Sequence, residues 1–310
     1  MKIWLGQSAP YLPQGSAVTI GNFDGVHTGH RHILNRLATE AAARNLPAIA
    51  IVFEPQPAEF FAQQARKTAP SRLSPLRDKL QLLAQTSSLH GVWVQRFNPT
   101  FANTPADVFI QTVLRERLNT RYLLVGDDFR FGKARGGDFD LLCAQSDFVT
   151  ENTPSILIAG ERASSTAVRQ ALAAGNLPRA EQILGHGYTL SGRVKHGAKL
   201  GRTIGCPTAN IHLPNHAYAL QGVFVVEATG AFGRRAGVAS FGHNPTVSHT
   251  PEAKLEVHLF DFAGDLYSER LHIRFLHKLR DEERFADLSS LQTQIAADMQ
   301  AAKIWYTQSR

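Results

Sequence analysis

The sequence has little cysteine and no long hydrophobic run. Its 310 residues include only two cysteines, Cys143 and Cys206, far apart in the chain. A disulfide framework is therefore not expected, which fits a cytoplasmic protein. No apolar stretch approaches the length that spans a bilayer, and residues 1–4 lack a signal-peptide pattern. We therefore expect no membrane partner.

Basic residues are in excess but are not clustered. The formal net charge of +7 favours anionic ligands. No run of five or more basic residues occurs, and no aromatic residues alternate with them, so nucleic acid is not the expected partner. A Walker-type phosphate loop is also absent, because residues 197–203 have Arg202 in place of the lysine and are one residue short. The length allows two domains with separate cores.

A strand, a glycine-rich turn, a helix and a second strand are predicted near the start of the chain. Residues 17–20 form the first strand, residues 21–30 the turn, and residues 48–53 the second, buried strand. The helix is expected to begin near Arg31. Together they predict a βαβ unit whose turn lies at the carboxyl edge of a parallel sheet. Free N–H groups at the helix start favour an anion there.

Two histidines in this turn are candidate catalytic residues. His27 and His30 are three residues apart, so one helical turn can present both imidazoles to one ligand. Two imidazoles that donate to phosphate oxygens would stabilise the charge that develops during attack on the α-phosphate of a nucleotide. Gly29 would let the ligand approach the backbone closely. A zinc site with His32 and Asp24 is an alternative, although no cysteine or further metal spacing supports it.

Two further segments of the first half combine glycine, acid and hydroxyl groups. A buried strand over residues 122–125 leads into the turn 126–132, where Asp128 could hold a ribose, a flavin edge or a metal, or form an Asx-turn. Residues 155–158 are expected to close the sheet. Residues 164–169 open a helix with more hydroxyls than capping needs, and its arginine could grip the phosphates of a leaving pyrophosphate.

These three segments resemble the motifs of the prokaryotic FMN adenylyltransferase module. That module is similar to the nucleotidyltransferases with the His-x-Gly-His signature, here at residues 27–30, and a Ser-Ser-Thr-x-x-Arg motif stands at residues 164–169. The segment 128–132 narrows the resemblance to nucleotidyltransferases whose acceptor substrate is a flavin. The resemblance implies catalytic roles for His27 and His30. It further implies nucleotide binding by Gly21, Phe23, Asp24, Gly29, Ser164, Ser165, Thr166 and Arg169, and flavin or nucleotide binding by Asn22, Asp128 and Phe129.

After Gly187 the pattern changes from helical spacing to short strands broken by glycine. Several close-spaced strands predict a small antiparallel barrel. The strands are expected at residues 188–194, 223–226, 236–239, 255–259 and 271–275. A helix from Asp287 would pack on the outside of the barrel. Its apolar face is expected to consist of Leu288, Leu291, Ile295 and Met299. We place the domain boundary near Gly185, which gives domains 1–185 and 186–310.

Two places in the second half carry candidate chemistry. The glycine-rich segment 201–210 ends in Thr208 and Asn210, whose oxygens suit Mg²⁺, although such residues are also common in turns. Glu256 points away from its apolar strand neighbours, and a carboxylate there could take a proton from an attacking hydroxyl or simply be solvated.

The segment 201–210 resembles the riboflavin kinase motif Gly-Arg-x-x-Gly-Phe-Pro-Thr-Ala-Asn. The resemblance implies that Thr208 and Asn210 bind Mg²⁺ and ATP phosphates, and that Glu256 is the base for the ribityl 5′-hydroxyl. It also implies nucleotide binding by Gly201, Gly205 and Pro207. Cys206 replaces the usual phenylalanine, which removes an aromatic wall near the nucleotide without removing a catalytic group.

Together the motifs cover nearly the whole chain and resemble the bifunctional riboflavin kinase/FMN adenylyltransferase family. The resemblance implies an N-terminal Rossmann-like α/β nucleotidyltransferase domain, then a small antiparallel riboflavin kinase-like β-barrel with a C-terminal helix. The barrel would phosphorylate riboflavin to FMN with ATP and Mg²⁺, and the first domain would adenylylate FMN to FAD with ATP. One alternative is a single-activity nucleotidyltransferase with a non-catalytic flavin-binding barrel. The other is a non-enzymatic flavin-sensing or nucleic-acid-binding protein. A homo-oligomer is left open.

Overall fold

The computed structural model describes residues 1–310 except 7, 9, 87, 198–205, 245–251 and 310. The chain forms two compact units, residues 1–70 with 79–164, and residues 71–78 with 165–310. The short segment 71–78 belongs with the second unit because its backbone and side chains bond there. The amide of Arg72 donates to the carbonyl of Ala217 at 2.7 Å. The domain boundary near Gly185 stays a prediction.

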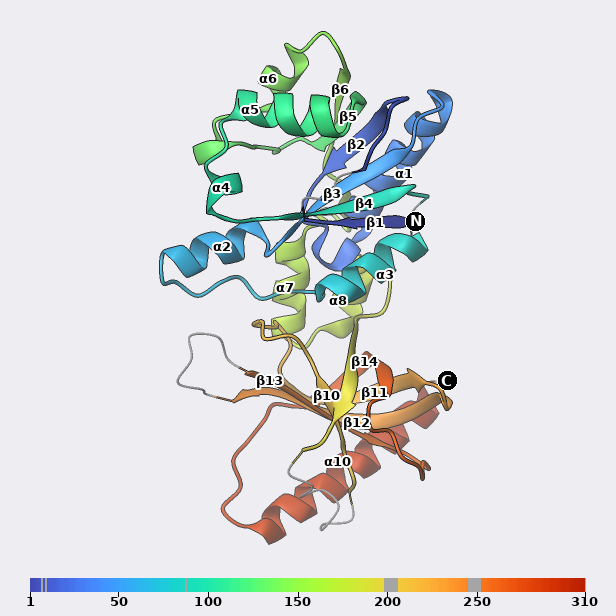
Figure 1. Cartoon of the computed structure of the whole chain (residues 1–310). Helices are drawn as coiled ribbons and strands as arrows, with labels where there is room; N and C mark the ends of the chain where they lie inside the picture. The colour runs from blue at the N-terminus through green and yellow to red at the C-terminus, as the bar shows by residue number, and fades with distance from the viewer. Residues whose placement is uncertain (7, 9, 87, 198–205, 245–251, 310) are drawn as a thin grey trace. The chain divides into compact units, whose positions relative to one another are not determined.

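The first unit contains a six-stranded, all-parallel sheet (Figure 1). The strands lie in the order β1-β4-β3-β2-β5-β6. Their bounds are β1 (Lys2–Leu5), β2 (Ser16–Ile20), β3 (Ala48–Glu54), β4 (Gly91–Arg96), β5 (Thr120–Gly126) and β6 (Val149–Thr153). The chain proceeds from β2 to β3 and β4 on one side but places β5 on the other side of β2. In open parallel sheets, ligands bind at the carboxyl ends of the strands where the order reverses, which are here β2 and β5. The predicted Rossmann-like fold is confirmed.

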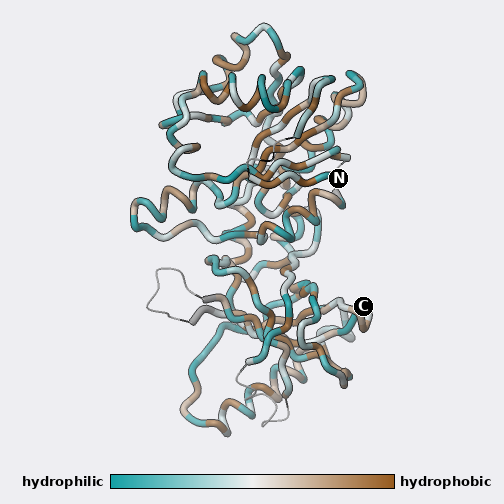
Figure 2. Tube along the Cα trace, viewed as in Figure 1, coloured by the Kyte–Doolittle hydropathy of each residue, from teal (hydrophilic) through white to brown (hydrophobic). Residues whose placement is uncertain are grey.

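Hydrophobic side chains are concentrated along the strands, as the brown stretches of the tube in Figure 2 show. Residues Ala48 to Val52 of β3 are all fully buried, as expected for a central parallel strand covered on both faces. The helices in the first half of the chain are α1 (Thr28–Ala43), α2 (Pro57–Gln64), α3 (Leu76–Thr86), α4 (Pro99–Ala102), α5 (Ala106–Phe109) and α6 (Phe139–Cys143). Helix α1 begins at Thr28 and not near Arg31, because His27 caps it.

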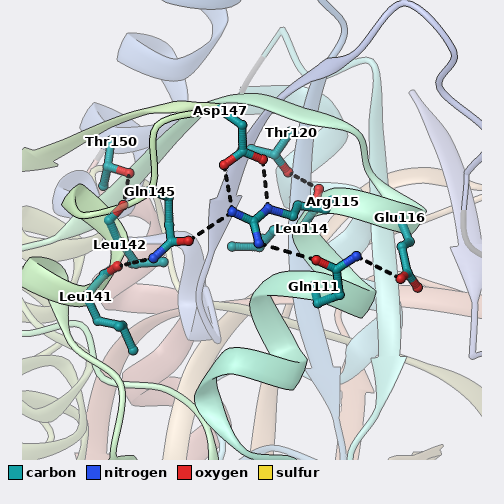
Figure 3. Close-up of polar contacts among 10 residues, drawn as sticks. All are labelled: Gln111, Leu114, Arg115, Glu116, Thr120, Leu141, Leu142, Gln145, Asp147 and Thr150. Carbon is teal, nitrogen blue, oxygen red and sulfur yellow. Dashed lines mark hydrogen bonds and ion pairs between the residues drawn. The ribbon is translucent and has the colours of Figure 1, made fainter.

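The helix before β5 continues from α5 as a π-helical segment, η2 (Ile110–Arg117). An arginine fixes its last turn, as Figure 3 shows. Both Nε and Nη2 of Arg115 donate to the carboxylate of Asp147 at 2.8 Å, and Nη2 also donates to Gln145 at 3.0 Å. The guanidinium holds the pKa of the Asp147 carboxyl below its usual value. This contact ties η2 to the segment that enters β6.

The expectation that residues 155–158 close the sheet is wrong. The edge strand beside β5 is β6, and Leu157 instead belongs to β7 (Leu157–Ile158), which pairs with β8 (Glu161–Arg162) in a separate antiparallel hairpin. The reason is the position of β6 at the sheet edge, where its sequence Val-Thr-Glu-Asn-Thr can be polar and half-exposed. Leu157, by contrast, is 63% exposed and supplies no core residue.

The second unit contains a closed barrel with the strand order β10-β13-β12-β11-β14-β9 (Figure 1). Its antiparallel strands are β9 (Thr189–Lys195), β10 (Ala209–His212), β11 (Gly222–Gly230), β12 (Gly233–Asn244), β13 (Glu252–Leu259) and β14 (Arg270–Arg280). The predicted barrel is confirmed, but the short strand β10 was missed because only Ala209 and Ile211 of its four residues are buried. The unit also contains α7 (Ser165–Ala173) and α8 (Leu177–Leu184).

The C-terminal helix α10 (Leu288–Gln308) begins where predicted, because the carboxylate of Asp287 accepts from the amide of Ser290 at 2.7 Å. Its expected apolar face is partly wrong, since Leu288 is 59% exposed. The buried face instead includes Asp298, whose carboxylate accepts from Nε and Nη2 of Arg280 in β14 at 2.8–3.2 Å. Apolar periodicity cannot reveal a helix face that packs through an ion pair. Among the described residues, no helix has the length and hydropathy needed to cross a bilayer.

Candidate functional site

The turn after β2 holds the chain in an unusual backbone conformation. The amide of Gly21 donates to the carbonyl of Ile51 at 3.1 Å, so the turn starts at the carboxyl end of the sheet. Phe23 follows in the left-handed region, with φ 47°, and its ring is buried. A Cβ on Gly21 would lie 3.1 Å from this ring. Asp24 is buried at the start of the helical turn η1 (Asp24–Val26), whereas Asn22 is exposed. Strained backbone of this kind is concentrated at functional sites.

The two candidate catalytic histidines lie in contact. His27 is the N-cap of α1, and its Nδ1 accepts a hydrogen bond from the amide of His30 at 3.3 Å. Because Nδ1 accepts, the neutral imidazole of His27 carries its proton on Nε2. The two rings stack with centroids 3.5 Å apart and 21° between their planes. Both side chains therefore occupy the start of one helix, where a phosphate group is favoured.

Gly29 allows another part of the candidate site to approach the histidines. A Cβ at this position would lie 3.2 Å from Cε1 of His27 and 3.3 Å from the carbonyl oxygen of Ala163. Within the first unit, the residue before Ser164 thus contacts the histidine turn. Ser165, Thr166 and Arg169 lie in α7 and belong to the second unit. Their contribution to the same ligand site stays a prediction.

The acidic turn after β5 carries contacts that sequence reasoning missed. Arg162 in β8 places Nη2 at 3.0 Å from Oδ2 of Asp128 and at 3.3 Å from Oδ1 of Asp127. Ser155 donates its hydroxyl to Asp127 at 2.8 Å. Because the side chain of Asp128 is 72% exposed, these ion pairs are weak and a ligand could replace them. The only sequence signal for Arg162 is its place just before the Ser-Ser-Thr motif.

Aromatic rings connect the carboxyl ends of β3, β4 and β5, and we call this group the aromatic platform. It consists of Phe53, Phe60, Phe97, Phe101, Phe109, Phe129 and Phe131. The rings of Phe53 and Phe97 lie 5.7 Å apart, and Phe129 stacks on Phe131 at the same centroid distance with 14° between the planes. Phe53, Phe97 and Phe129 are only half-buried, so part of each residue is exposed to solvent.

In the second unit, strand register brings the candidate kinase residues together. Asn210 in β10 lies directly opposite Glu256 in β13. Leu255 and Val257 are each 1% exposed, so Glu256 points to the opposite, outer face of its strand, as the alternation predicted. Lys254 places its Nζ 3.2 Å from Oε2 of Glu256. The half-buried Thr208 immediately precedes β10.

The end of the glycine-rich motif that the structure describes, at Pro207, contacts a neighbour of Glu256 on the same strand. His258 lies two residues after Glu256 and on the same face of β13. Its Nδ1 lies 2.9 Å from the carbonyl oxygen of Pro207. Burial, with the nearby charge of Glu256, raises the pKa of the Cys206 thiol to about 11. A Cβ on Gly197 would lie 2.4 Å from Nδ2 of Asn210. The backbone at Gly197 thus lies close to the side-chain amide of Asn210.

Two predicted nucleotide-binding residues, Gly201 and Gly205, lie outside the described residues. In the part of the chain that the structure describes, no group of three or more His, Cys, Asp or Glu side chains is arranged to hold a metal ion. The zinc alternative for the histidine turn therefore gains no support. The hydroxyl of Thr208 and the amide oxygen of Asn210 are hard donors of the kind that Mg²⁺ prefers, and Asn210 lies opposite Glu256 in the strand register.

Comparisons with known proteins show the family to which the chain is similar. The FAD synthetase family model matches residues 10–167, and the riboflavin kinase family model matches residues 184–306. Two curated relatives, both named bifunctional riboflavin kinase/FMN adenylyltransferase, are similar over most of the chain. The protein from Haemophilus influenzae is 43% identical over 94% of this chain and 95% of its own length. The protein from Escherichia coli K12 is 46% identical over 94% of this chain and 93% of its own length.

A solved structure shares the fold over nearly the entire chain. It is titled a macrolide-efflux protein from Streptococcus pneumoniae and is 27% identical, with a TM-score of 0.79. The match covers 96% of this chain and 97% of that one.

Proposed function

The chain belongs to the bifunctional riboflavin kinase/FMN adenylyltransferase family, and we propose that its two reactions use the two sites described above. The enzyme phosphorylates riboflavin to FMN with ATP and adenylylates FMN to FAD with ATP, releasing pyrophosphate. The observation that carries our assignment of the adenylylation site is the stacked His27–His30 pair at the start of α1.

In the first unit, a phosphate oxygen of FMN would attack the α-phosphorus of ATP. The new P–O bond forms as the bond to the β-phosphate oxygen breaks, and pyrophosphate leaves. His27 and His30 would donate hydrogen bonds to the α-phosphate oxygens, where negative charge increases during attack. The N–H groups at the start of α1 add to this stabilisation. Support comes from Gly29, where the absence of a Cβ lets the ring of His27 and the carbonyl oxygen of Ala163 lie close to the helix start.

The aromatic platform would hold the isoalloxazine ring of FMN. Its half-buried rings, Phe53, Phe97 and Phe129, offer stacking surfaces at the ends of three neighbouring strands. Asp128 lies in the same turn as Phe129, and its exposed ion pair with Arg162 can be exchanged for contacts to the ligand. We assign Gly21, Asn22, Phe23 and Asp24 to the nucleotide side, because they form the turn that leads into the histidines.

In the second unit, Glu256 would take the proton from the ribityl 5′-hydroxyl of riboflavin. The hydroxyl oxygen then attacks the γ-phosphorus of ATP, and ADP leaves. Thr208 and Asn210 would hold Mg²⁺, which neutralises phosphate charge when it is bound. Support for this assignment comes from the direct pairing of Asn210 with Glu256 across two strands. Pro207 is assigned to the nucleotide side because it adjoins Thr208.

We further propose that the enzyme acts in the cytoplasm, where its two widely separated cysteines stay reduced. We also keep the expectation that the enzyme forms a homo-oligomer. Light scattering of the purified chain tests its oligomeric state.

Product analysis tests the proposed sites. Purified protein is mixed with riboflavin, ATP and Mg²⁺, and the flavins are separated by chromatography. We expect FMN first and FAD later. The Glu256→Ala variant should make FAD only from supplied FMN, and the His27→Ala variant should stop at FMN. If either folded variant loses both activities, the assignment of two independent sites is wrong. A folded His27→Ala variant with full FAD synthesis would refute the adenylylation site.

A further inference from the structure

Two buried side-chain amides of the first unit have polar atoms without a hydrogen-bond partner. Gln56 is 6% exposed and Gln95 is 9% exposed. Within the described residues, Nε2 of Gln56 and Oε1 of Gln95 have no partner. An unpaired buried donor or acceptor destabilises a fold, so such atoms in a native structure call for a physical explanation. A bound ligand is one such explanation.

The orientation of each amide is set by its other contacts. Nε2 of Gln95 donates to the carbonyl of Arg96 at 3.0 Å, which leaves Oε1 as an unused acceptor. Gln56 forms a capping box with Glu59 at the start of α2, and its backbone amide donates to Glu59 at 2.9 Å. The prolines on both sides of Gln56 restrict its backbone. Gln56 thus offers a positioned donor and Gln95 a positioned acceptor.

Both amides lie at the strand ends that carry the aromatic platform. Gln95 is the direct neighbour of Phe53 in the parallel register of β3 and β4. Two residues beyond Gln95, the amide of Phe97 donates to the carbonyl of Glu54 at 3.1 Å, and Gln56 follows Glu54 by two residues. Neighbouring residues in a parallel pair point to the same face of the sheet, so Gln95 and Phe53 share a face.

We propose that Gln56 and Gln95 recognise the pyrimidine edge of the isoalloxazine ring of FMN, an inference that rests on the proposed adenylylation site. This edge presents an N–H donor at N3 between two carbonyl acceptors. Oε1 of Gln95 accepts from N3–H, and Nε2 of Gln56 donates to an adjacent carbonyl. Stacking on phenylalanine tolerates any flat ring, whereas a positioned donor and acceptor select the flavin edge.

The kinetics of FMN adenylylation test the proposal in the full-length enzyme. In the Gln56→Leu and Gln95→Leu variants, KM for FMN should rise roughly 3- to 10-fold, as expected for a lost neutral hydrogen bond. KM for ATP and kcat should change less than twofold. The matched control is Gln63→Leu on the exposed side of α2, which should behave as wild type. Riboflavin phosphorylation by the same preparations shows that the second unit is intact.

A modified substrate provides a test that does not depend on folding of a variant. FMN methylated at N3 lacks the donor, so wild-type enzyme should use it with a kcat/KM roughly 3- to 10-fold lower. The Gln95→Leu variant should show no such difference between the two substrates. Equal use of both substrates by wild type, or unchanged KM for FMN in both variants, would overturn the proposal. Failure of the proposed adenylylation site is distinguishable, because it would show as full FAD synthesis by His27→Ala.

Discussion

Replacement of Glu256 by glutamine should remove most riboflavin kinase activity from a folded barrel. The side chain points away from the core that Leu255 and Val257 form, and both of these residues are 1% exposed. Glutamine has the same length and keeps an oxygen toward Lys254, whose Nζ lies 3.2 Å from the carboxylate. It cannot accept the proton of an attacking hydroxyl at neutral pH. The change therefore tests the base without disturbing the packing.

The expected size of the effect follows from the role. General base catalysis contributes roughly 10²- to 10⁴-fold, which corresponds to about 3–5 kcal/mol of activation free energy at 1.36 kcal/mol per tenfold. The ion pair of Glu256 with Lys254 is a smaller effect, because the two side chains are 28% and 52% exposed. Such surface pairs contribute about 0.2–1 kcal/mol, at most about fivefold in rate. Lys254→Gln is therefore the matched control.

The assay follows FMN formed from riboflavin and FAD formed from supplied FMN in separate reactions of the same preparation. Glu256→Gln should lose the first activity and keep the second, and Lys254→Gln should keep both within about fivefold. Thermal unfolding of each variant confirms that the barrel is folded. A Glu256→Gln enzyme that forms FMN within tenfold of the wild-type rate would refute the role of this carboxylate as the base.

Three further predictions concern the histidines, a buried aspartate and the cysteines. His27→Ala or His30→Ala should lower FAD formation from FMN by on the order of 10²–10³ and spare FMN formation; a change below tenfold would contradict the assignment. Burial raises the pKa of the Asp78 carboxyl despite its hydrogen bonds, so the folded chain holds this proton more tightly than the unfolded chain. The free energy of unfolding should thus fall as pH rises from about 4 through the folded-state pKa. In Asp78→Asn, the plot of Tm against pH should be flatter over this range. An unchanged slope would contradict the assigned role of Asp78. Iodoacetamide at pH 8 should label the exposed Cys143 before the buried Cys206, whose pKa is raised to about 11. Mass spectrometry reports the order of labelling, and earlier labelling of Cys206 would contradict this prediction.

Local patterns of the sequence were sufficient to predict much of the fold and the placement of two pairs of features in the candidate sites. The three-residue spacing of His27 and His30 at a helix start predicted that one turn presents both imidazoles on one side, and the two rings stack there. Alternation of apolar residues likewise predicted the outward position of Glu256. Both inferences depend only on the period of one helix or one strand. The period of a helix or a strand can be recognised from a few consecutive residues.

Features that depend on distant segments could not be predicted in this way. The edge strands β1 and β6 and the short barrel strand β10 have too few buried residues to show a pattern. The contact of Arg162 with Asp127 and Asp128 depends on a hairpin that returns to the turn after β5. The buried face of α10 depends on Arg280, which is 18 residues away from its partner Asp298. None of these partners can be paired from one sequence alone.

The hydrogen bonds of buried polar side chains distinguish the two edges of the parallel sheet. At the amino ends of β2 and β5, Ser16 and Thr120 donate their hydroxyls to backbone carbonyls at 2.6 Å and 2.7 Å. At the carboxyl ends, Gln56, Gln95 and Thr153 are each at least nine-tenths buried and have an atom without a partner among the described residues. Stability alone would favour satisfied groups at both edges. The unpaired atoms at one edge therefore fit our proposal that FMN binds there, because the strand ends of an open parallel sheet are where ligands bind.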